Sequence, residues 1–505
     1  MTVRLAVLDL GSNSFHVLVA DLSHGRLHPV AREREMLHLG RVVASAGELG
    51  EDVRARAIST VAHFGELARR TGATERVAVA TATLRELADG GRLLRELSRA
   101  AGTEVVVLPG EEEARLSYLG ACSAVTVPQG PTLVMDLGGG SLELAVGQGG
   151  AMSAVASLPL GASRLSTLLS SDPPRRGEVQ ALCAQVDEQL DTLAPELRSP
   201  RVARTVAVGG TVRAMARIQG FGTWLPPSVN MLTFERDDLD GLRDRLLGLD
   251  LDGRLGMENM KARRADHLHV AAVILARVLQ ALGLSQVTVS DWGLREGVLL
   301  DAHGITAPPA ALELREREVD RVRRALLPTA DLQPHVVKLC ERVFDGTHAL
   351  HGLEAQDREL LRHAARLMDV GRALALRRHQ QHGAYLVEHS ELKGFTPSEI
   401  AMLCTLVRFH TSKGLDERFP PFASLSAGRQ ERVRRLLPLL QLADGLDRPR
   451  DEALTDLMLQ LREGRLAVTL LGRDEQVARA ELERRAQLFT ATFGVRLDIV
   501  DRMGR

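Results

Sequence analysis

The sequence predicts an α/β protein of two similar lobes with a cleft between them, followed by an all-helical domain and a small C-terminal α+β subdomain. An internal repeat predicts the lobes: an apolar run, an Asp-Leu-Gly turn and a second apolar run occur at residues 5–20 and again at residues 133–146. Strand and helix patterns alternate between residues 76 and 290, as in layered α/β folds. After Gly304 the apolar residues recur at the three- and four-residue spacing of helices.

Each copy of the repeat predicts a β-hairpin closed by small residues, and the remaining elements follow in order. Further strands are expected at residues 76–80, 104–108, 205–208 and 286–290, with helices at 84–97, from about 111 onward and from 212 to 218. Pro308 and Pro309 mark a linker, and helices are expected from 312 to 446. The end of the chain predicts a hairpin around Gly464, a helix at 475–489 and a strand at 495–500. The expected domains are residues 1–125, 126–304, 310–450 and 451–505.

Composition excludes several classes of protein. The 505 residues are 45% hydrophobic and 26% charged, which is typical of a globular chain and not of a disordered one. The 64 basic and 65 acidic residues leave a net charge of -1, so no nucleic-acid or membrane partner is expected. The four cysteines form no CxxC pair, residues 1–10 lack the pattern of a signal peptide, and Arg277 interrupts the longest apolar stretch. We therefore expect a cytoplasmic protein.

The two small-residue turns are suited to binding phosphate. Glycine and serine let backbone N–H groups converge on an anion without obstruction by larger side chains. One such turn alone is commonly an empty hairpin, but here two matched copies each follow an aspartate, Asp9 or Asp136, at the end of a strand. Carboxylates in that position suit Mg²⁺ or Mn²⁺. The sequence has neither GxxxxGK[ST] nor GxGxxG after a strand, which disfavours P-loop NTPases and Rossmann dehydrogenases.

Seven short stretches in fixed order carry a resemblance to a known family. The chain resembles the exopolyphosphatase/guanosine pentaphosphate phosphohydrolase family, within the actin-like phosphotransferase superfamily, which implies two actin-like (ribonuclease H-like) lobes. The matching stretches span nearly all of the first 300 residues: VLDLGSNSFH at 7–16, ATATLR at 80–85, GEEEARL at 110–116, MDLGGGSLEL at 135–144, LPLG at 158–161, GGT at 209–211 and LREG at 294–297.

The resemblance implies roles for individual residues. Glu113 matches the family's general base, which would activate the attacking water, and Glu143 matches a carboxylate near the metal and the phosphate. Arg85 and Arg264 match basic positions that face the phosphates. The expected metal ligands are Asp9, Asp136 and Glu143, and the expected phosphate-binding residues are Ser12, Asn13, Ser14, Arg85, Gly138, Gly139, Gly140, Ser141, Gly209, Gly210, Thr211 and Arg264.

The helical region resembles the family's HD-like domain, with one important departure. His335, Asp369 and Asp444 match three positions of the HD metal site, and His382 and His410 are also retained. Met368 stands where the motif has histidine, and Gln380 replaces another histidine. Because a thioether is a poor ligand for hard or borderline metals, the sequence predicts no working metal site here. The expected role of the domain is to bind the substrate chain and to form a homodimer.

These observations favour one function over several alternatives. The leading expectation is an exopolyphosphatase, which removes terminal orthophosphate from inorganic polyphosphate by metal-assisted in-line attack of water. Hydrolysis of the 5′ γ-phosphate of guanosine pentaphosphate (pppGpp) is the close alternative. A non-catalytic sensor of phosphate chains or alarmones is opposed by the intact Glu113, Asp136 and Glu143. An actin-like kinase or chaperone ATPase is opposed by the segment 110–115.

Overall fold

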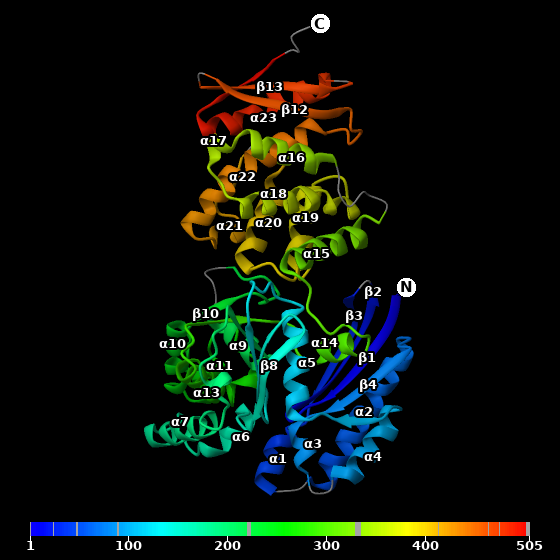
Figure 1. The fold of residues 1–505 in the computed structure, drawn as a ribbon, viewed down its shortest axis with the longest axis vertical. Helices are drawn as coiled ribbons and strands as arrows, with labels where there is room; N and C mark the ends of the chain where they lie inside the picture. Colours follow the sequence, from blue (N-terminus) through cyan, green and yellow to red (C-terminus); the bar gives the residue numbers. More distant parts are fainter. Residues whose placement is uncertain are drawn as a thin grey trace. The chain divides into compact units, whose positions relative to one another are not determined.

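The computed structural model describes residues 2–500 except 24, 47–48, 88–89, 220–223, 329–334, 413, 463 and 474. The chain divides into two compact units (Figure 1). The first unit comprises Met1–Gly220 and Val229–Leu314, and the second comprises Phe221–Ser228 and Arg315–Arg505. The predicted order of α/β lobes, helical region and small α+β end is confirmed, and each unit is described by itself below.

The first unit contains two mixed sheets that repeat one arrangement. In each sheet three antiparallel strands join parallel strands, and the predicted hairpins form the centre of the arrangement. The first sheet has the order β3-β2-β1-β4-β5, with β1 (Thr2–Leu10), β2 (Ser14–Ser23), β3 (Arg26–Met36), β4 (Glu75–Ala80) and β5 (Val105–Val107). The second has the order β10-β11-β9-β6-β7-β8, with β6 (Thr132–Leu137), β7 (Leu142–Gln148), β8 (Ala151–Leu158), β9 (Arg204–Val208), β10 (Thr233–Glu235) and β11 (Gln286–Val289).

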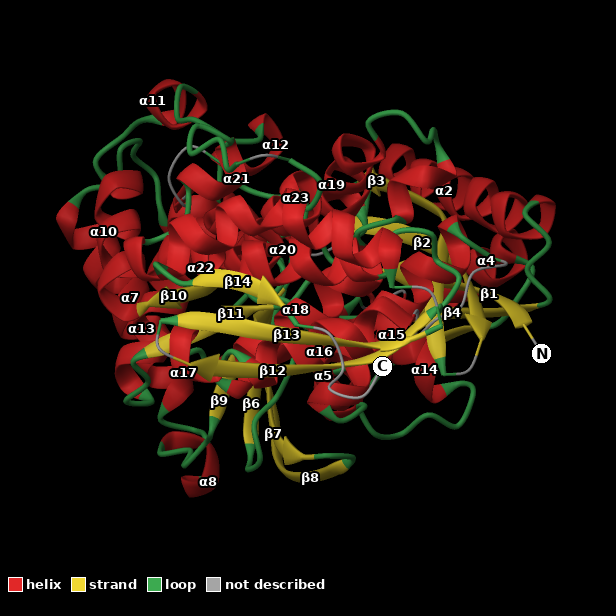
Figure 2. Cartoon of the chain, turned by 90° about the horizontal axis from the view of Figure 1, so that it is seen from above, coloured by secondary structure: helices red, strands yellow, loops and turns green. Residues whose placement is uncertain are grey.

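Helices cover both sheets of the first unit (Figures 1 and 2). The helix expected at residues 84–97 is instead two helices, α3 (Ala82–Glu86) and α4 (Gly90–Ala101). The long apolar stretch forms α13 (Leu268–Ala281), which is buried along almost its whole length. No helix in the described residues has the length and apolarity to cross a membrane. The other helices are α1 (Leu39–Ala46), α2 (Glu51–Arg70), α5 (Gly110–Cys122), α6 (Ala162–Leu165), α7 (Arg176–Leu190), α8 (Pro195–Arg198), α9 (Gly210–Gln219), α10 (Arg236–Leu247), α11 (Leu251–Leu255), α12 (Ala262–Ala265) and α14 (Leu294–Asp301).

Helices α5 and α14 are exchanged between the lobes. Helix α5 follows β5 of the first sheet but packs on β6, β7 and β8 of the second, whereas α14 follows β11 and packs on β1. The two helices also pack against each other, and glycines make that contact possible. A Cβ at Gly120 would lie 2.0 Å from the oxygen of Gly293, and one at Gly297 would lie 1.9 Å from the oxygen of Leu116. The backbones therefore touch where the helices cross.

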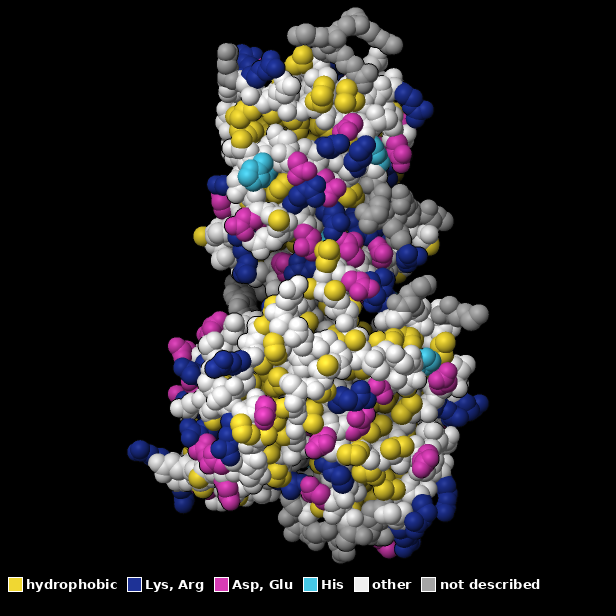
Figure 3. All heavy atoms as spheres, in the orientation of Figure 1, with side chains coloured by type: hydrophobic (Ala, Val, Ile, Leu, Met, Phe, Trp, Pro, Cys, Tyr) yellow, Lys and Arg dark blue, Asp and Glu magenta, His cyan; other side chains and the backbone are white. Residues whose placement is uncertain are grey.

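The second unit consists of helices around one apolar core and ends in a small sheet. Its helices are α15 (Ala311–Leu326), α16 (His335–Gly346), α17 (His348–His351), α18 (Ala355–Leu367), α19 (His379–His389), α20 (Pro397–Phe409), α21 (Pro420–Ala423) and α22 (Ala427–Leu446). The predicted hairpin, helix and final strand are β12 (Leu454–Arg462), β13 (Arg465–Gly472), α23 (Gln476–Phe493) and β14 (Arg496–Ile499). On the face drawn in Figure 3, acidic and basic side chains are interspersed over this unit, as a balanced net charge implies.

Candidate active site

Strand register places three side chains in a row on each sheet of the first unit. In the first sheet Asp9 pairs with His16, which pairs with Arg34. In the second sheet Asp136 pairs with Glu143, which pairs with Ser157. Directly paired residues on neighbouring strands project from the same face. Each row therefore begins with the predicted aspartate and extends across the hairpin to the third strand.

The two predicted phosphate-binding turns, residues 11–14 and 138–141, are called the phosphate turns below, and they pack directly against each other. A Cβ at Gly140 would lie 2.4 Å from Ser12 Oγ, and one at Gly139 would lie 3.0 Å from Asn13 Cβ. Larger residues at either glycine would separate the turns. Since the turns come from different lobes, the predicted phosphate-binding residues of both lobes meet at one place.

The helix that follows the third strand supports the turn in each lobe. In the first lobe the N–H of Gly40 in α1 donates to the carbonyl of Ser12 over 2.7 Å. In the second lobe the N–H groups of Ala162 and Ser163 in α6 donate to the carbonyls of Gly138 and Gly139 over 3.1 and 3.0 Å. These contacts engage turn carbonyls and hold the turns in position. The LPLG stretch at 158–161 leads into α6, and a Cβ at its Gly161 would lie 2.3 Å from the backbone of Gly139.

Glu113 lies in the first turn of α5 and is buried, with 7% of its surface exposed. Its Oε2 has no hydrogen-bond donor among the described residues, although Arg85 Nη1 lies 3.8 Å away. Burial and the neighbouring carboxylate of Glu143 raise the pKa of Glu113 well above the usual glutamate range. A Cβ at Gly110 would lie 2.4 Å from Ser157 Cβ, so the start of α5 is pressed against the row of the second lobe.

Asp136 and Glu143 are held by hydroxyl donors. Ser117 of α5 donates to Asp136 Oδ2 over 2.6 Å, and Ser157 donates to Glu143 Oε1 over 2.9 Å. Burial raises the pKa of both carboxyl groups, and the charge of Asp136 raises that of Glu143 further. Glu143 is 2% exposed, because α5 covers this face of β7. Helix α5 therefore encloses the Glu143 side chain.

Asp9 completes a set of four carboxylates. Burial, with a further contribution from Asp136, raises its pKa to about 6, although Arg295 opposes the shift. The four carboxylates repel one another, and one of their oxygen atoms accepts no hydrogen bond among the described residues. Together they offer only oxygen ligands, which suits a hard cation such as Mg²⁺ or Mn²⁺. The residues present therefore fit the expected metal, with Asp9, Asp136 and Glu143 as the groups to hold it.

Basic side chains lie beside the carboxylates, and most of them were not assigned a role from sequence. Arg295 at the start of α14 has Nη1 3.3 Å from His16 Nδ1, and burial beside this arginine holds the pKa of His16 well below its usual range. His16 is therefore neutral. Burial and then Arg213 lower the pKa of Arg264 to about 10, because neighbouring guanidinium groups repel each other. No ion pair with a carboxylate is formed, within the described part of the chain, by Arg34, Arg213, Lys261, Arg263, Arg264 or Arg295.

The Gly209–Thr211 turn joins these arginines to the turn of the second lobe. Gly209 has φ +110°, and a Cβ there would lie 2.7 Å from the oxygen of Leu137. Arg264 Nη1 donates to Thr211 Oγ1 over 3.0 Å, and its Nη2 would lie 2.3 Å from a Cβ at Gly210. Of the two predicted arginines, Arg264 thus lies against this turn. Arg85 lies beside Glu113 and donates to the carbonyl of Leu108.

The predicted HD-like positions of the second unit do not form one site. His335 Nε2 lies 2.6 Å from the carbonyl oxygen of Leu454, and Met368 is fully buried in the core. Asp369 and Asp444 share the guanidinium of Arg450, with N–O distances of 2.9 and 2.6 Å. In α15, Arg315 pairs with Glu399 and Arg321 pairs with Glu318, so carboxylates offset the charges of these two arginines.

Comparison with known proteins identifies the family of the chain. The sequence model of the Ppx/GppA phosphatase family matches residues 18–304, and that of Ppx/GppA phosphatase domain III matches residues 315–487. The chain belongs to the Ppx/GppA phosphatase family. Its two lobes have the actin-like fold expected of that family.

Several solved structures resemble part of the chain. A Ppx/GppA family member from Aquifex aeolicus is 27% identical, over 60% of this chain and 98% of that one, with a TM-score of 0.53. An exopolyphosphatase from Cytophaga hutchinsonii is 26% identical, over 59% of this chain and 98% of that one, with a TM-score of 0.54. An exopolyphosphatase-like protein is 26% identical, over 60% and 98%, with a TM-score of 0.55. Each of these solved chains is matched almost completely by about three fifths of the present Ppx/GppA chain.

Proposed function

We propose that this Ppx/GppA phosphatase is an exopolyphosphatase that hydrolyses the terminal phosphoanhydride bond of inorganic polyphosphate. The observation that carries the proposal is the gathering of two kinds of side chain around the phosphate turns. Buried carboxylates with raised pKa values lie beside basic side chains that form no ion pair with a carboxylate among the described residues. A phosphate chain needs cations along its length and a base at its end, and the site supplies both.

The chain's own residues position the reaction in the following way. The N–H groups and hydroxyls of the two turns hold the terminal phosphoryl group, and the arginines neutralise its equatorial oxygens. Ionised Glu113 orients one water molecule and accepts its proton at Oε2, the atom that has no other donor. Bound Mg²⁺ or Mn²⁺ supplies charge neutralisation at the phosphate when it is held by Asp9, Asp136 and Glu143.

A basic set of five arginines and one lysine favours polyphosphate over pppGpp as the substrate. The set consists of Arg34, Arg213, Lys261, Arg263, Arg264 and Arg295, whose cationic groups suit a long run of phosphates better than the short phosphate groups of a nucleotide. Hydrolysis of pppGpp remains the second candidate, because its terminal phosphoanhydride would meet the same turns and the same Glu113.

One assay separates these candidates. Orthophosphate release is measured with long-chain polyphosphate and with pppGpp, at matched concentrations of terminal phosphate, with Mg²⁺ and after chelation. We expect a higher kcat/KM for polyphosphate and loss of activity without the cation. A higher kcat/KM for pppGpp would reverse the substrate assignment. Tight binding of either compound without phosphate release would instead support a sensor and reject hydrolysis.

A further inference from the structure

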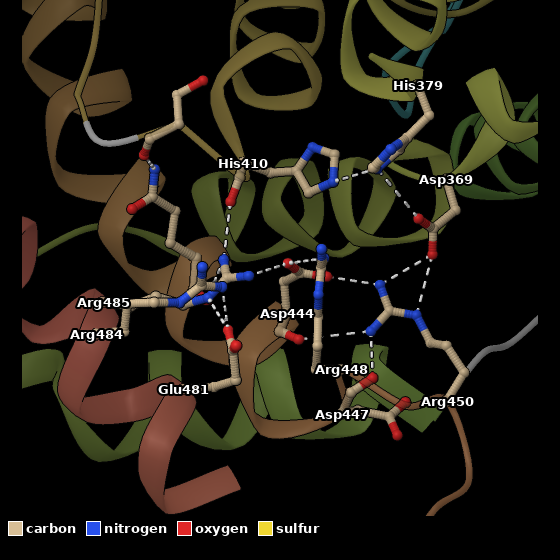
Figure 4. A network of polar contacts seen from close by, with 12 residues as sticks. Asp369, His379, His410, Asp444, Asp447, Arg448, Arg450, Glu481, Arg484 and Arg485 are labelled. Atoms are coloured by element: carbon tan, nitrogen blue, oxygen red, sulfur yellow. Dashed lines mark hydrogen bonds and ion pairs between the residues drawn. The ribbon is translucent and has the colours of Figure 1, made fainter. Parts of the chain in front are cut away.

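The second unit brings two imidazole rings and a carboxylate together at a point that the proposed hydrolysis does not use (Figure 4). His379 is the first residue of α19, His410 follows α20, and Asp369 follows α18. One ligand atom of each residue lies within 4.8 Å of the other two. The two Nε2 atoms are 3.3 Å apart, and His379 Nε2 is 3.7 Å from Asp369 Oδ1.

The backbone around the two rings decides where their protons are. His379 Nδ1 lies 3.2 Å from the carbonyl oxygen of Leu376, and His410 Nδ1 lies 2.8 Å from that of Val407. A carbonyl oxygen only accepts hydrogen bonds, so each Nδ1 carries the ring's proton. Each neutral ring is then left with a lone pair on Nε2. Two lone pairs therefore face each other across 3.3 Å, and both repel unless a positive species lies between them.

Asp369 contributes a third acceptor to the same point. Arg450 donates to its Oδ2 from Nε and Nη2 over 3.0 and 2.9 Å, which fixes the carboxylate plane. Its Oδ1 has no hydrogen-bond donor among the described residues. Arg372 Nε lies 3.1 Å from Oδ1 but is not oriented to donate to it. This oxygen forms an ion pair with Arg372 but accepts no hydrogen bond within the described residues, and it is the one nearest to His379. Three acceptor atoms therefore converge at this point.

We propose that Asp369, His379 and His410 bind one divalent transition-metal ion of the zinc type. Two imidazoles and one carboxylate form a common ligand set for such ions, and a carbonyl on the second ring nitrogen is the usual partner of a metal-binding histidine. With Zn–N bonds of about 2.0–2.1 Å, a tetrahedral ion holds its nitrogens about 3.4 Å apart. The observed separation of 3.3 Å is therefore already suitable.

This site differs from the one that the sequence motif suggested. It shares Asp369 with the set His335, Met368, Asp369 and Asp444, and it shares His410 with the other retained histidines, so the methionine at position 368 does not remove it. Arg372 and Arg450 lie on the same carboxylate and repel a dication. We therefore expect weaker binding than for an isolated ligand set, and an anionic or water ligand in the open fourth position. The nitrogen ligands select against Mg²⁺, which separates this site from the active site.

The test uses the full-length protein without a histidine tag, stripped with a chelator and then reloaded with one equivalent of Zn²⁺ or Co²⁺. We expect elemental analysis after desalting to find one Zn²⁺ per chain, and bound Co²⁺ to give visible absorption bands of low coordination number. His379→Ala and His410→Ala should each weaken Zn²⁺ binding by about 100-fold or more, since even loss of an orienting partner costs about 10–100-fold. His382→Ala, one turn further along α19, is the matched control and should bind like the wild type.

The outcomes separate the proposal from its alternatives. Failure of the folded wild type to retain Zn²⁺ or Co²⁺ at pH 8 overturns the proposal, and it means that an extra proton bridges the two rings instead. Equal weakening in His379→Ala, His410→Ala and His382→Ala also overturns it, because the metal then lies elsewhere. Circular dichroism verifies that each variant is folded. Glu113→Gln should retain the metal fully, which makes the result independent of hydrolysis.

Discussion

The two lobes of the first unit share a strand arrangement but carry different chemistry at equivalent positions. The first row reads Asp9, His16 and Arg34, and the second reads Asp136, Glu143 and Ser157. The helices beside the two rows differ in the same way. Helix α14 brings the basic Arg295 to His16, whereas helix α5 brings the acidic Glu113 close to Glu143. A duplicated backbone thus supports two unlike half-sites, one basic and one acidic.

This difference has an energetic consequence. Burial raises the pKa of Asp9, Glu113 and Glu143 alike, but Arg295 opposes the rise at Asp9, whereas neighbouring carboxylates add to the rise at Glu113 and Glu143. Repelling buried charges destabilise the folded state at neutral pH until a cation or proton enters. We infer that the acidic half-site is the reactive one and that the basic half-site holds the substrate.

The largest expected effect comes from the acidic side. Glu113→Gln preserves size and removes only the base, so kcat for orthophosphate release should fall by about 10²–10⁴-fold. The exposed neighbour Glu111 supplies the control, since Glu111→Gln should leave kcat within about twofold of the wild type, as expected for a solvated surface position. If folded Glu113→Gln protein had the wild-type kcat, Glu113 would not be the general base.

Removal of the divalent cation should have a comparable effect. Exhaustive chelation, with metal content verified, is expected to abolish most turnover, because Asp9, Asp136 and Glu143 then lack their counter-charge. Added Mg²⁺ should restore activity and raise the melting temperature. In Asp136→Asn the rise in melting temperature should be smaller. Full activity in the metal-free protein would contradict the assigned role of these carboxylates.

The stability of the first unit should fall when either glycine at the crossing of α5 and α14 is enlarged. Gly297→Ala and Gly120→Ala each place a methyl group within 2.0 Å of backbone and should lower the free energy of unfolding by about 1–3 kcal/mol or more. Gly241 of α10 has nothing within 4 Å of a Cβ, so Gly241→Ala should raise stability by about 0.5–1 kcal/mol. Urea denaturation of the three variants measures the expected decreases and the expected increase in the free energy of unfolding. Unchanged stability of Gly297→Ala would show that the lobes are not in contact there.

Glu143 and His16 occupy equivalent positions in the two rows, so variants at these residues test whether the two half-sites differ in charge. The folded-state pKa of Glu143 is raised above its unfolded value, so its penalty is absent below the unfolded pKa and fully present above the folded one. Without metal, Glu143→Gln should therefore add about 1–2 kcal/mol of stability at pH 9 and almost none at pH 4. Loss of its charge should also lower the pKa of Glu113 and move the acidic limb of kcat/KM to lower pH.

His16→Gln is the matched variant at the equivalent position. His16 is neutral in the folded protein, so its replacement should leave the acidic limb of the pH profile in place. Equal shifts in Glu143→Gln and His16→Gln would mean that the two half-sites are not electrostatically different.

The smallest expected effect lies on the basic side. Arg34→Gln should raise KM for long polyphosphate several-fold with little change in kcat, and should reduce the slope of log KM against log salt by about 1. Arg69 pairs with Glu66 on the surface of α2, so Arg69→Gln should change neither quantity. A fall in kcat without a change in KM would assign Arg34 to the reaction itself.

Much of the fold followed from the sequence because local pattern and tertiary structure agree. The hairpins, their turns and the helical region were predictable from apolar spacing. Strand β3 was not, since its charged run Arg32-Glu33-Arg34-Glu35 conceals the strand pattern in a largely exposed edge element. Arg34 was therefore missed, although hairpin register alone could have paired Asp9 with His16.

The remaining site residues depend on packing between distant elements. Arg213 and Arg295 lie near the starts of α9 and α14, far along the chain, and no local pattern indicates that both act with Arg264 on His16. The motif comparison similarly directed attention to His335, whereas the fold brings His379 to His410 through the packing of α19 on α20. Sequence spacing cannot report which ends of packed helices coincide.

The exchange of α5 and α14 also determines how the first unit folds. Leu5 and Val7 of β1 are buried beside Val298 of α14, a residue nearly 300 positions later in the chain. A fragment ending at residue 125 would leave that face of its sheet exposed to water, and the second lobe without α5 would do the same. Neither lobe can bury both faces of its sheet alone, so we expect the two lobes to unfold together.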